Sequence, residues 1–313
     1  MPANAPMRLD PVSLRLFVSV CEEGTIMAAA DREHIAASAI SKRIAEMEEW
    51  IGTKLLTRGQ RGVCPTPAGE ALLRQGRQIL GSMHRLQSRL REYGQGIQGH
   101  VRVLANMASM AEFAPDEIAA FVAAHPGIAV SLEERRNADV VMPIAEGRAD
   151  IGITRDFVPM RELTAIPLRR DRFAVVVDRG HPLAPHRELS FRDTLGYERV
   201  GIALDTSLPA SLHTQMCMAA ATAGVDLIHR VQVSGYDAAL RLVRGSRFVT
   251  VIPAPAAARL SAARDLVVIP LTDPWAVQQF VLCCRPGIED QTPAVRQMLD
   301  FLITRAAQEA AGH

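Results

Sequence analysis

Apolar residues in the N-terminal part of the chain repeat with the period of a helix. Four of them stand at i, i+3, i+4 and i+7 and so share one face: Leu14, Phe17, Val18 and Cys21. Ser13 is placed to cap the start of this helix, and Gly24 ends it. Thr25 can cap a second helix, which runs through three alanines to about Arg32. The pattern therefore predicts two short helices in succession.

A third helix is predicted in the stretch IAASAISKRIAEMEE, residues 35–49. Its apolar residues fall at steps of four, three and four, the spacing of one buried stripe: Ile40, Ile44, Met47 and Ile51. Away from this stripe lie hydroxyls and charges: Ser38, Ser41, Lys42 and Glu49. A short helix with a buried back and a front of hydroxyls and cations suits the major groove of DNA. An ordinary surface helix is the alternative that this stretch alone leaves open.

The segment after the third helix is basic and contains turn residues. It reads TKLLTRGQRGVCPT and holds Lys54, Arg58 and Arg61 with no acidic residue among them. Gly59 and Gly62 favour a short hairpin whose cations would meet DNA phosphates, and a solvated loop is the alternative. Two short helices, a tight turn, a third helix with a polar front and a hairpin together predict a winged helix-turn-helix.

A long helix is predicted to begin at Thr66, whose hydroxyl can cap it, with Pro67 in the first turn. Its apolar and small residues alternate at steps of four and three: Leu72, Gly76, Ile79, Met83, Leu86 and Leu90. An amphipathic helix of this length needs a partner to bury its stripe, and the same helix of a second subunit is the expected one. Three glycines then mark a hinge: Gly94, Gly96 and Gly99.

Past residue 100 the pattern changes to short strand-like runs that alternate with helices. The expected helices lie at about 109–124 and 138–146, and the expected strands at 101–105, 128–134, 149–154, 173–177, 230–234, 248–253, 266–271 and 279–284. Such alternation predicts an α/β fold with mainly parallel sheets. About 210 residues of this kind suffice for two linked lobes, with a small-molecule site in the cleft between them.

Composition limits the classes of function. The chain has 313 residues, 48% of them hydrophobic and 22% charged, as in a soluble protein of two or three domains. The formal net charge is +1, so any surface that binds nucleic acid must be local. No apolar run is long enough to span a membrane, and the N-terminus MPANAPMRLDP lacks a secretory core. We therefore expect a cytoplasmic protein without a membrane partner.

The sequence offers no catalytic, metal or cofactor motif. It contains no nucleophile elbow, phosphate loop, HExxH or dinucleotide fingerprint. His181 and His186 flank a proline-rich turn and make a poor metal site. The five cysteines form neither a CxxC pair nor a zinc spacing, so we interpret them as small apolar residues: Cys21, Cys64, Cys217, Cys283 and Cys284. An enzyme, a metal and a cofactor are not expected.

Taken in order, these motifs resemble the LysR-type transcriptional regulators over essentially the whole chain. The most specific run extends from Leu14 to Glu70 and includes LRLF, EEGT, SAISKRI, EMEEWIGTKLL and TPAGE. Further matching motifs are HPGI at 125–128, GRADIGI at 147–153, RGHPLA at 179–184 and VIP at 251–253. The resemblance implies a regulator that binds promoter DNA, responds to a small-molecule effector and assembles through its linker helix into dimers, usually joined as tetramers.

The resemblance also implies the domain organisation. The fold class is α/β: a winged helix-turn-helix and a long linker helix, then a two-lobed effector-binding domain of the periplasmic-binding-protein type. The expected bounds are 8–65 for the DNA-binding domain, 66–93 for the linker helix, 94–99 for the hinge and 100–305 for the effector domain. Within the last, lobe I covers about 100–165 and 273–305, and lobe II about 166–272.

Residues with a DNA role follow from the same resemblance. The expected contacts are Thr25, Arg32, Ala37, Ser38, Ser41, Lys42, Arg43, Arg58 and Arg61. Serine hydroxyls and cations can reach bases or phosphates, and contacts to several phosphates make binding strongly salt-dependent. The sequence departs from the family where Ser-Gln commonly starts the recognition helix, because it has Ala36 and Ala37. Ala36 cannot cap the helix, and Ala37 lacks an amide that reads adenine but can meet a thymine methyl.

Effector residues are expected mainly at the end of the first strand of the second domain. The resemblance points to Asn106, Met107, Ser109, Met110, Arg155, Thr206, Ser207, Ile252 and Pro253. Backbone N–H groups at a helix start favour an anion, and the methionines leave an apolar, adaptable surface. Ser109 and Asn106 can also be simple caps. A small organic ligand is expected, and one with a carboxylate and an apolar body is a candidate.

Two other functions stay open from the sequence. A thiol-based redox sensor of the same family is one, although Cys217 has no evident resolving cysteine and the neighbours Cys283 and Cys284 point to opposite faces of a strand. A solute-binding protein for uptake is the other, because its lobes could look the same. Such a protein would need an export signal and would not need residues 9–92.

Overall fold

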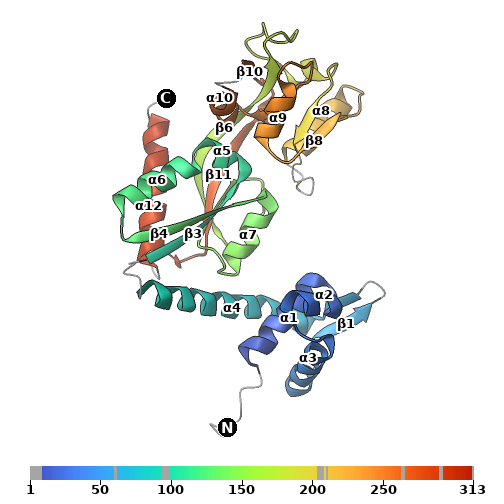
Figure 1. The fold of residues 1–313 in the computed structure, drawn as a ribbon, viewed down its shortest axis with the longest axis vertical. Helices are drawn as coiled ribbons and strands as arrows, with labels where there is room; N and C mark the ends of the chain where they lie inside the picture. The colour runs from blue at the N-terminus through green and yellow to red at the C-terminus, as the bar shows by residue number, and fades with distance from the viewer. Residues whose placement is uncertain are drawn as a thin grey trace. The chain divides into compact units, whose positions relative to one another are not determined.

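A computed structural model describes residues 9–59, 62–93, 99–202, 208, 211–261, 265–288 and 292–311 (Figure 1). The chain divides into two compact units: one runs up to Arg91, and the other begins at Glu92 and, apart from the turn Glu146–Arg148, contains the rest. None of the described helices combines the length and the apolar character that crossing a bilayer requires.

The first unit contains helices, a hairpin and a long final helix. In chain order its elements are α1 (Pro11–Glu23), α2 (Ile26–Glu33), α3 (Ala37–Ile51), β1 (Leu56–Gly59), β2 (Gly62–Pro65) and α4 (Pro67–Tyr93). The two strands pair antiparallel from Leu56 opposite Pro65 to Gly59 opposite Gly62. The three predicted short helices, the hairpin and the long helix are therefore confirmed.

The cap of α1 differs from the prediction. Asp10 is the N-cap, and its carboxylate accepts hydrogen bonds from the backbone N–H groups of Val12 and Ser13 at 2.9 and 3.0 Å. Ser13 instead lies inside the helix, where its hydroxyl donates to the Asp10 carboxylate at 2.6 Å. Pro11 explains the earlier start, because proline suits the first helical position, where no N–H is needed. Gly24, with φ 69°, ends α1 as predicted.

The apolar stripes of the first three helices form one core. Phe17, Ile40 and Met47 are buried in it, and Leu55 from the segment before the hairpin joins them. Ile51 was predicted to belong to the buried stripe but is 37% exposed. It is the last residue of α3, since Gly52 adopts φ 79° and ends the helix, so no core lies beneath it.

One buried carboxylate connects α3 to the hairpin. Glu48 accepts hydrogen bonds from the backbone N–H groups of Leu55 and Leu56 at 2.9 and 3.2 Å, and from the ammonium of Lys54 at 2.6 Å. Burial opposes ionisation of this group, but the hydrogen bonds from Lys54 and the two N–H groups outweigh it and lower the pKa of Glu48. The hairpin is thereby held in place against the third helix.

Replacing Glu48→Ala should loosen the hairpin. The N–H groups of Leu55 and Leu56 would lose their acceptor, at a cost of about 1–3 kcal/mol. Amide hydrogen exchange across residues 54–66 should accelerate, while exchange in the second unit stays unchanged. Glu49→Ala, an exposed neighbour on the same helix, is the matched control. Equal exchange rates in the two variants would contradict this role for Glu48.

The stripe of α4 has two different environments. Its first part packs on α1, where Leu73 is buried and a side chain at Gly76 would collide with Leu14. Further along, three apolar side chains stay exposed on the described surface: Ile79 (45%), Met83 (37%) and Leu86 (58%). The side chain of Leu90 lies outside the described residues. The first half of the predicted seam therefore serves the unit's own core, and the second half is open for a partner.

The second unit is built on a mixed sheet of seven strands within the described residues. Its strand order is β10 (Leu266–Pro270), β6 (Thr164–Asp178), β11 (Val277–Cys284), β5 (Ile151–Arg155), β3 (Gly99–Asn106) and β4 (Ile128–Arg135), and β9 (Thr250–Pro253) pairs with β6. A separate pair is β7 (Val200–Ile202) with β8 (Val231–Val233). The prediction of mainly parallel sheets is wrong, because β6 and β11 pair antiparallel with every strand beside them.

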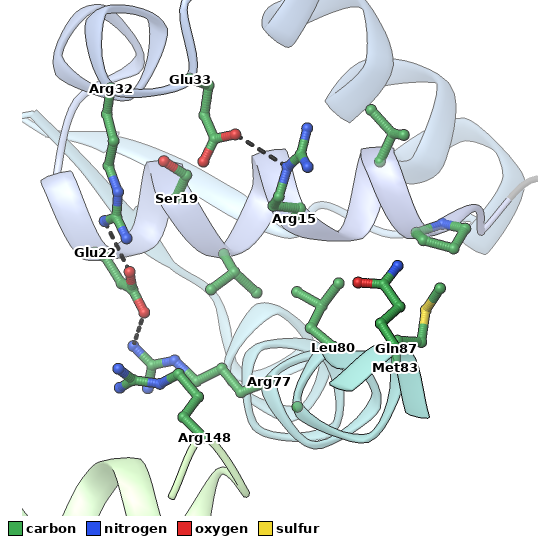
Figure 2. A pocket seen from close by; sticks show the side chains of 14 residues that line it. Arg15, Ser19, Glu22, Arg32, Glu33, Arg77, Leu80, Met83, Gln87 and Arg148 are labelled. Atoms are coloured by element: carbon green, nitrogen blue, oxygen red, sulfur yellow. Dashed lines mark hydrogen bonds and ion pairs between the residues drawn. The ribbon is translucent and has the colours of Figure 1, made fainter. Parts of the chain in front are cut away.

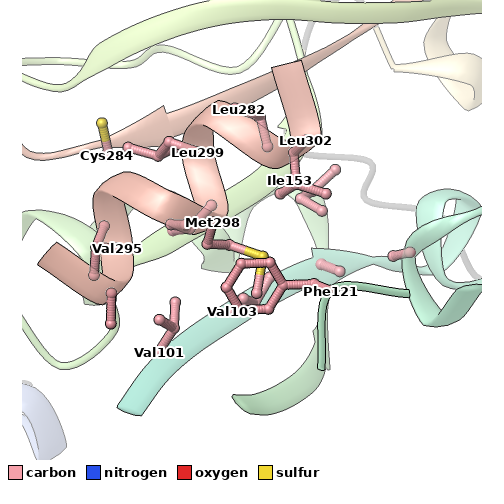
Figure 3. Packing of buried hydrophobic residues seen from close by; sticks show 14 of the residues in the cluster. Val101, Val103, Phe121, Ile153, Leu282, Cys284, Val295, Met298, Leu299 and Leu302 are labelled. Carbon is pink, nitrogen blue, oxygen red and sulfur yellow. The ribbon is translucent and has the colours of Figure 1, made fainter. Parts of the chain in front are cut away.

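The long strand β6 passes through both lobes. Ile166 and Leu168, in its first half, pack on a core that also contains Phe121 of α6 (Ala114–Ala124) and Met298 of α12 (Pro293–Ala311). Figure 3 shows α12 laid over β3 in this core, with Met298 against Phe121 and Val103. The second half of β6 enters two other cores, with helices α8 (Leu212–Thr222), α9 (Tyr236–Val243) and α10 (Ala254–Ser261). One strand thus joins the two lobes.

The helix predicted at 109–124 is two helices. They are α5 (Met107–Glu112) and α6, separated at Phe113, which adopts φ −150° and ψ −28°. Pro115 near the start of α6 cannot donate the hydrogen bond that a continuous helix would need. Phe113 uses the break to reach the core, where its ring meets that of Phe280 edge-on, with centroids 5.1 Å apart. The helix predicted at 138–146 is α7 (Asn137–Ala145).

Candidate functional site

The polar front of α3 is open to solvent. Ser38 and Lys42 are exposed and Ser41 is half-buried, while Ile40 and Ile44 behind them are fully packed. Ala36 is the N-cap of α3 and makes no side-chain hydrogen bond, as expected for alanine. The N–H groups in the first turn of α3 therefore have no capping side chain. Ala37 is partly buried against the core. The arrangement presents hydroxyls, one ammonium and an uncapped helix start on one surface.

Two arginines expected at DNA are engaged inside the first unit. Arg43 donates to the Ser13 hydroxyl at 3.0 Å and pairs with the Asp10 carboxylate at 3.3 Å, so it ties α3 to the start of α1. Arg32 pairs with Glu22 and Glu23, each at 2.9 Å. Figure 2 shows Arg32 turned toward Glu22, which in turn meets Arg77 of α4. Both arginines therefore have a structural role in the unbound protein.

The hairpin lies against the turn between α1 and α2. The Val63 N–H donates to the Gly24 carbonyl at 2.7 Å, and Thr25 caps α2 by accepting from the Ala28 N–H at 3.1 Å. Gly62 has φ 125°, and a side chain there would collide with the Gly24 carbonyl, so this contact requires glycine. The side chain of Arg58 and the whole of Arg61 lie outside the described residues.

The second unit contains a cavity of about 120 Å³ between its lobes. The residues that line it come from both: Asn106, Met107, Ala108, Glu134, Arg135, Arg136, Asn137, Arg155, Phe157, Phe173, Ser211, Leu212, Ser234, Tyr236 and Gln278. Three of the residues expected from the sequence, Asn106, Met107 and Arg155, are therefore together at this cavity. The first turns of α5, α7, α8 and α9 also meet it.

Asn106 and Ser109 have local roles at the start of α5. Asn106 is the N-cap, and its side-chain oxygen accepts from the Ser109 N–H at 2.8 Å. Its amide nitrogen donates to the side-chain oxygen of Asn137 at 2.7 Å. The same Asn137 oxygen accepts from the Thr154 hydroxyl at 3.0 Å. Ser109 is fully buried and donates its hydroxyl to the Asn106 carbonyl at 2.9 Å. The cap is therefore Asn106 and not Ser109, which does not line the cavity.

Arg155 is buried and already paired. Its guanidinium makes two hydrogen bonds to the Asp171 carboxylate, at 2.5 and 2.6 Å, and lies 3.6 Å from the centre of the Phe280 ring. Only 2% of its side chain is exposed. A ligand in the cavity therefore meets an arginine whose charge is balanced by Asp171.

Three other expected effector residues, Met110, Ile252 and Pro253, do not line the cavity. Met110 packs on the core of the first lobe, and Ile252 is buried in a core of the second. Pro253 is the last residue of β9, where it stands opposite Phe173 of β6. Thr206 and Ser207 lie outside the described residues. The cavity is lined instead by Ser211, Ser234, Tyr236 and Gln278, which were not expected from the sequence, although Ser234 is the last residue of a predicted strand.

The described cysteines are free thiols. Burial raises the pKa of Cys283 and that of Cys21 to about 12 each, so neither forms a thiolate at neutral pH. The sulfur of Cys217 lies 3.4 Å from a ring nitrogen of His213. Among the described residues no group of three or more histidine, cysteine or acidic side chains could hold a metal ion.

One carboxyl group beside the cavity departs strongly from its usual behaviour. Glu112 of α5 is buried, and burial together with the charge of Asp171 raises its pKa to about 9. Glu112 is therefore protonated at neutral pH. Arg155 then has one ionised carboxylate, Asp171, as its partner, and the group as a whole is close to neutral.

Glu112→Gln should change how stability depends on pH. A folded-state pKa above the usual value gives stability that is present at low pH and lost as the pH rises from about 4.5 through about 9. Glutamine cannot ionise, so urea denaturation should show a flatter profile for the variant, by up to about 1.4 kcal/mol per pH unit. The exposed Glu162→Gln is the control. Parallel profiles for wild type and Glu112→Gln would contradict the protonated state of Glu112.

Comparison with known proteins matches both units. Residues 12–70 match the model of the bacterial regulatory helix-turn-helix proteins of the lysR family, and residues 94–307 match the LysR substrate binding domain. The uncharacterized regulator YnfL of Escherichia coli is 28% identical over 179 residues, 57% of this chain and 60% of that protein, so the match spans about three fifths of this relative. BenM of Acinetobacter baylyi, a transcriptional regulator, is 25% identical over 280 residues, 89% of this chain and 90% of its own length.

Solved structures show the same fold. The crystal structure of CbnR, a LysR family transcriptional regulator, has a TM-score of 0.62 at 21% identity and covers 96% of this chain and 99% of CbnR. CbnR has also been solved with its target DNA, again with a TM-score of 0.62 at 21% identity, covering 95% of this chain and all of that one. The fold class expected from the sequence, a winged helix-turn-helix with an α/β effector domain, is thus confirmed.

Proposed function

The chain belongs to the LysR family of bacterial transcriptional regulators, and we propose that it binds promoter DNA through α3 under the control of a small organic effector bound between its lobes. The observation that carries the DNA role is the exposed front of α3, with Ser38, Ser41 and Lys42 on a helix whose back is buried. YnfL, BenM and CbnR, which the chain resembles, are transcriptional regulators by name. Work on DNA would place the protein in the cytoplasm.

Three kinds of contact to DNA follow from this proposal. Ser38, Ser41 and Lys42 meet base edges and phosphates in the major groove, where Ala37 can contact a thymine methyl. The uncapped start of α3 offers N–H groups to a phosphate. Arg58 and Arg61 of the hairpin are proposed as phosphate contacts, and Thr25 stands at the start of α2. Arg32 and Arg43 would have to leave their carboxylates before they could reach DNA.

The double change Ser41→Ala/Lys42→Ala should abolish specific binding to the DNA just upstream of the protein's own gene. In a gel-shift assay the wild type should bind tightly and lose affinity steeply as salt rises, because cations on the protein displace counterions from phosphates. Arg15→Ala, which removes a cation paired with Glu33 on another helix, should bind like the wild type. Retained specific binding by the double variant would contradict the role of α3.

Association of two chains through α4 is the second part of the proposal. The exposed apolar residues Ile79, Met83 and Leu86 line one side of this helix, together with Gln75 and Gln78. An apolar row on a long helix is best buried against another helix, and a second copy offers the matching row. Dimers of this kind, joined further into tetramers, would place two α3 helices on one operator.

Leu86→Glu should weaken this association. A carboxylate in an apolar helix interface lacks a partner and resists desolvation. Light scattering on a sizing column should show a lower mass for the variant at micromolar concentration, with helix content unchanged by circular dichroism. Arg74→Glu, an exposed site on the same helix, should keep the mass of the wild type. An unchanged mass for Leu86→Glu would exclude this face as the interface.

The effector site is proposed to be the cavity lined by Asn106, Met107 and Arg155. A ligand there would touch both lobes, and so could shift the angle between the DNA-binding modules of an assembled regulator. A redox sensor is less well supported, because burial holds Cys21 and Cys283 as thiols and Cys217, whose sulfur lies 3.4 Å from a ring nitrogen of His213, has no evident resolving cysteine. A solute-binding protein would have no use for the helix-turn-helix at residues 12–70.

A further inference from the structure

The short helix α5 packs on both lobes at once. Ala108 and Met110 of this helix belong to the core of the first lobe. Met107 and Ala111 pack instead on a core of the second lobe, to which α9 and α10 contribute. Met107 also lines the cavity, and Glu112 ends the helix about 7.5 Å further along its axis, at about 1.5 Å per residue. A displacement of α5 at the cavity would therefore be carried to its other end.

An arginine of the second lobe holds that other end. Arg259, in the last turn of α10, donates to the Glu112 carbonyl at 2.5 Å and pairs with the Asp116 carboxylate of α6 at 2.7 Å. The last carbonyls of a helix have no donor within the helix, and the break at Phe113 leaves Glu112 at such an end. One guanidinium thus satisfies a helix end and balances a carboxylate, both of which belong to the first lobe.

The contact between α10 and α5 involves small side chains. The two helices pack on each other, and α10 contributes Ala256 and Ala257 to the buried core at this place. An alanine side chain is one methyl group, so it buries little apolar area and interlocks little with a neighbouring helix. Arg259 is about half exposed, and exposed ion pairs contribute only modestly to the stability of a fold. Such a contact can bias the arrangement of two lobes without determining the fold of either.

We propose that Arg259 is a latch between the lobes, and that its contacts with Asp116 and with the Glu112 carbonyl hold the arrangement that the protein has without effector. This rests on the proposed control by a ligand bound in the cavity. Arg259 does not line the cavity, so it acts through α5 and is a positioning residue. A ligand that moves the start of α5 would strain the latch at its end, and release of Arg259 would let the lobes turn.

Amide hydrogen exchange of the full chain, with no ligand added, tests the latch directly. Arg259→Glu places a carboxylate against Asp116 and the Glu112 carbonyl, so exchange in α5 and α10 should become at least about 3-fold faster. Exchange in α12 and in the first unit should stay as in the wild type. The charge swap Arg259→Glu/Asp116→Arg rebuilds the ion pair and should bring the rates back toward those of the wild type. Arg241→Glu, the same charge change at an exposed site of α9, is the matched control and should have no effect.

The bend of bound DNA reports whether the latch matters for regulation. Fluorescence energy transfer between dyes at the two ends of the DNA just upstream of the protein's own gene measures that bend. Without any effector, Arg259→Glu should change the transfer efficiency, and the charge swap should reverse the change. A residue that only stabilises α10 would alter the exchange rates and leave the bend as it is in the wild type.

Three results would overturn the latch. These are unchanged exchange of α5 and α10 in Arg259→Glu, faster exchange that leaves the DNA bend unchanged, and equal effects of Arg259→Glu and Arg241→Glu. Failure of the wild type to bind this DNA would instead refute the proposed function. The exchange measurement needs no DNA, so it would still decide whether Arg259 joins the two lobes.

Discussion

The ion pair between Arg155 and Asp171 is the interaction on which the effector domain depends. Arg155 ends β5, Asp171 lies midway along β6, and Phe280 of β11 stacks on the guanidinium, so one buried contact joins three strands. It sits where β6 passes from one lobe to the other. Removing either partner would leave a buried charge unpaired, at a cost of about 3–5 kcal/mol. The pair therefore holds β5, β6 and β11 together where the two lobes meet.

That pair also decides what the cavity can recognise. Because Asp171 balances Arg155, and Glu112 stays protonated beside them, the strongest cation near the cavity is not free to bind an acid. Recognition passes to uncharged polar groups that line the cavity, such as Ser211, Ser234 and Gln278. Such groups hold a ligand without a full opposite charge, so the bound state need not be tight. A sensor must release its ligand when the ligand's concentration falls, and moderate affinity suits that task.

Periodic patterns in the sequence predicted much of the fold, and single residues explain the failures. The stripe Ile40, Ile44 and Met47 located α3 because burial repeats with the helix period. The start of α1 was misplaced because Asp10 and Ser13 are both good caps, and Pro11 settles the choice. Strand direction was missed because the predicted runs 173–177 in β6 and 279–284 in β11 have the apolar composition of buried strands, which looks alike in parallel and antiparallel sheets.

The candidate site was harder to predict than the fold for a physical reason. A cavity gathers residues from segments far apart, such as Asn106, Ser211 and Tyr236, and no local pattern records that they meet. Family resemblance located the start of α5, yet it could not reveal that Ser109 faces inward or that Arg155 is already paired.

One feature of the DNA-binding unit is nevertheless visible in the sequence. Ala36 stands before α3, where a capping side chain is usual, and its methyl group cannot cap. A helix start without a cap costs about 1 kcal/mol, and the N–H groups that it leaves unpaired can be satisfied by an outside oxygen. In α3 that oxygen would belong to a DNA phosphate. Binding to DNA would thus complete a cap that folding leaves open.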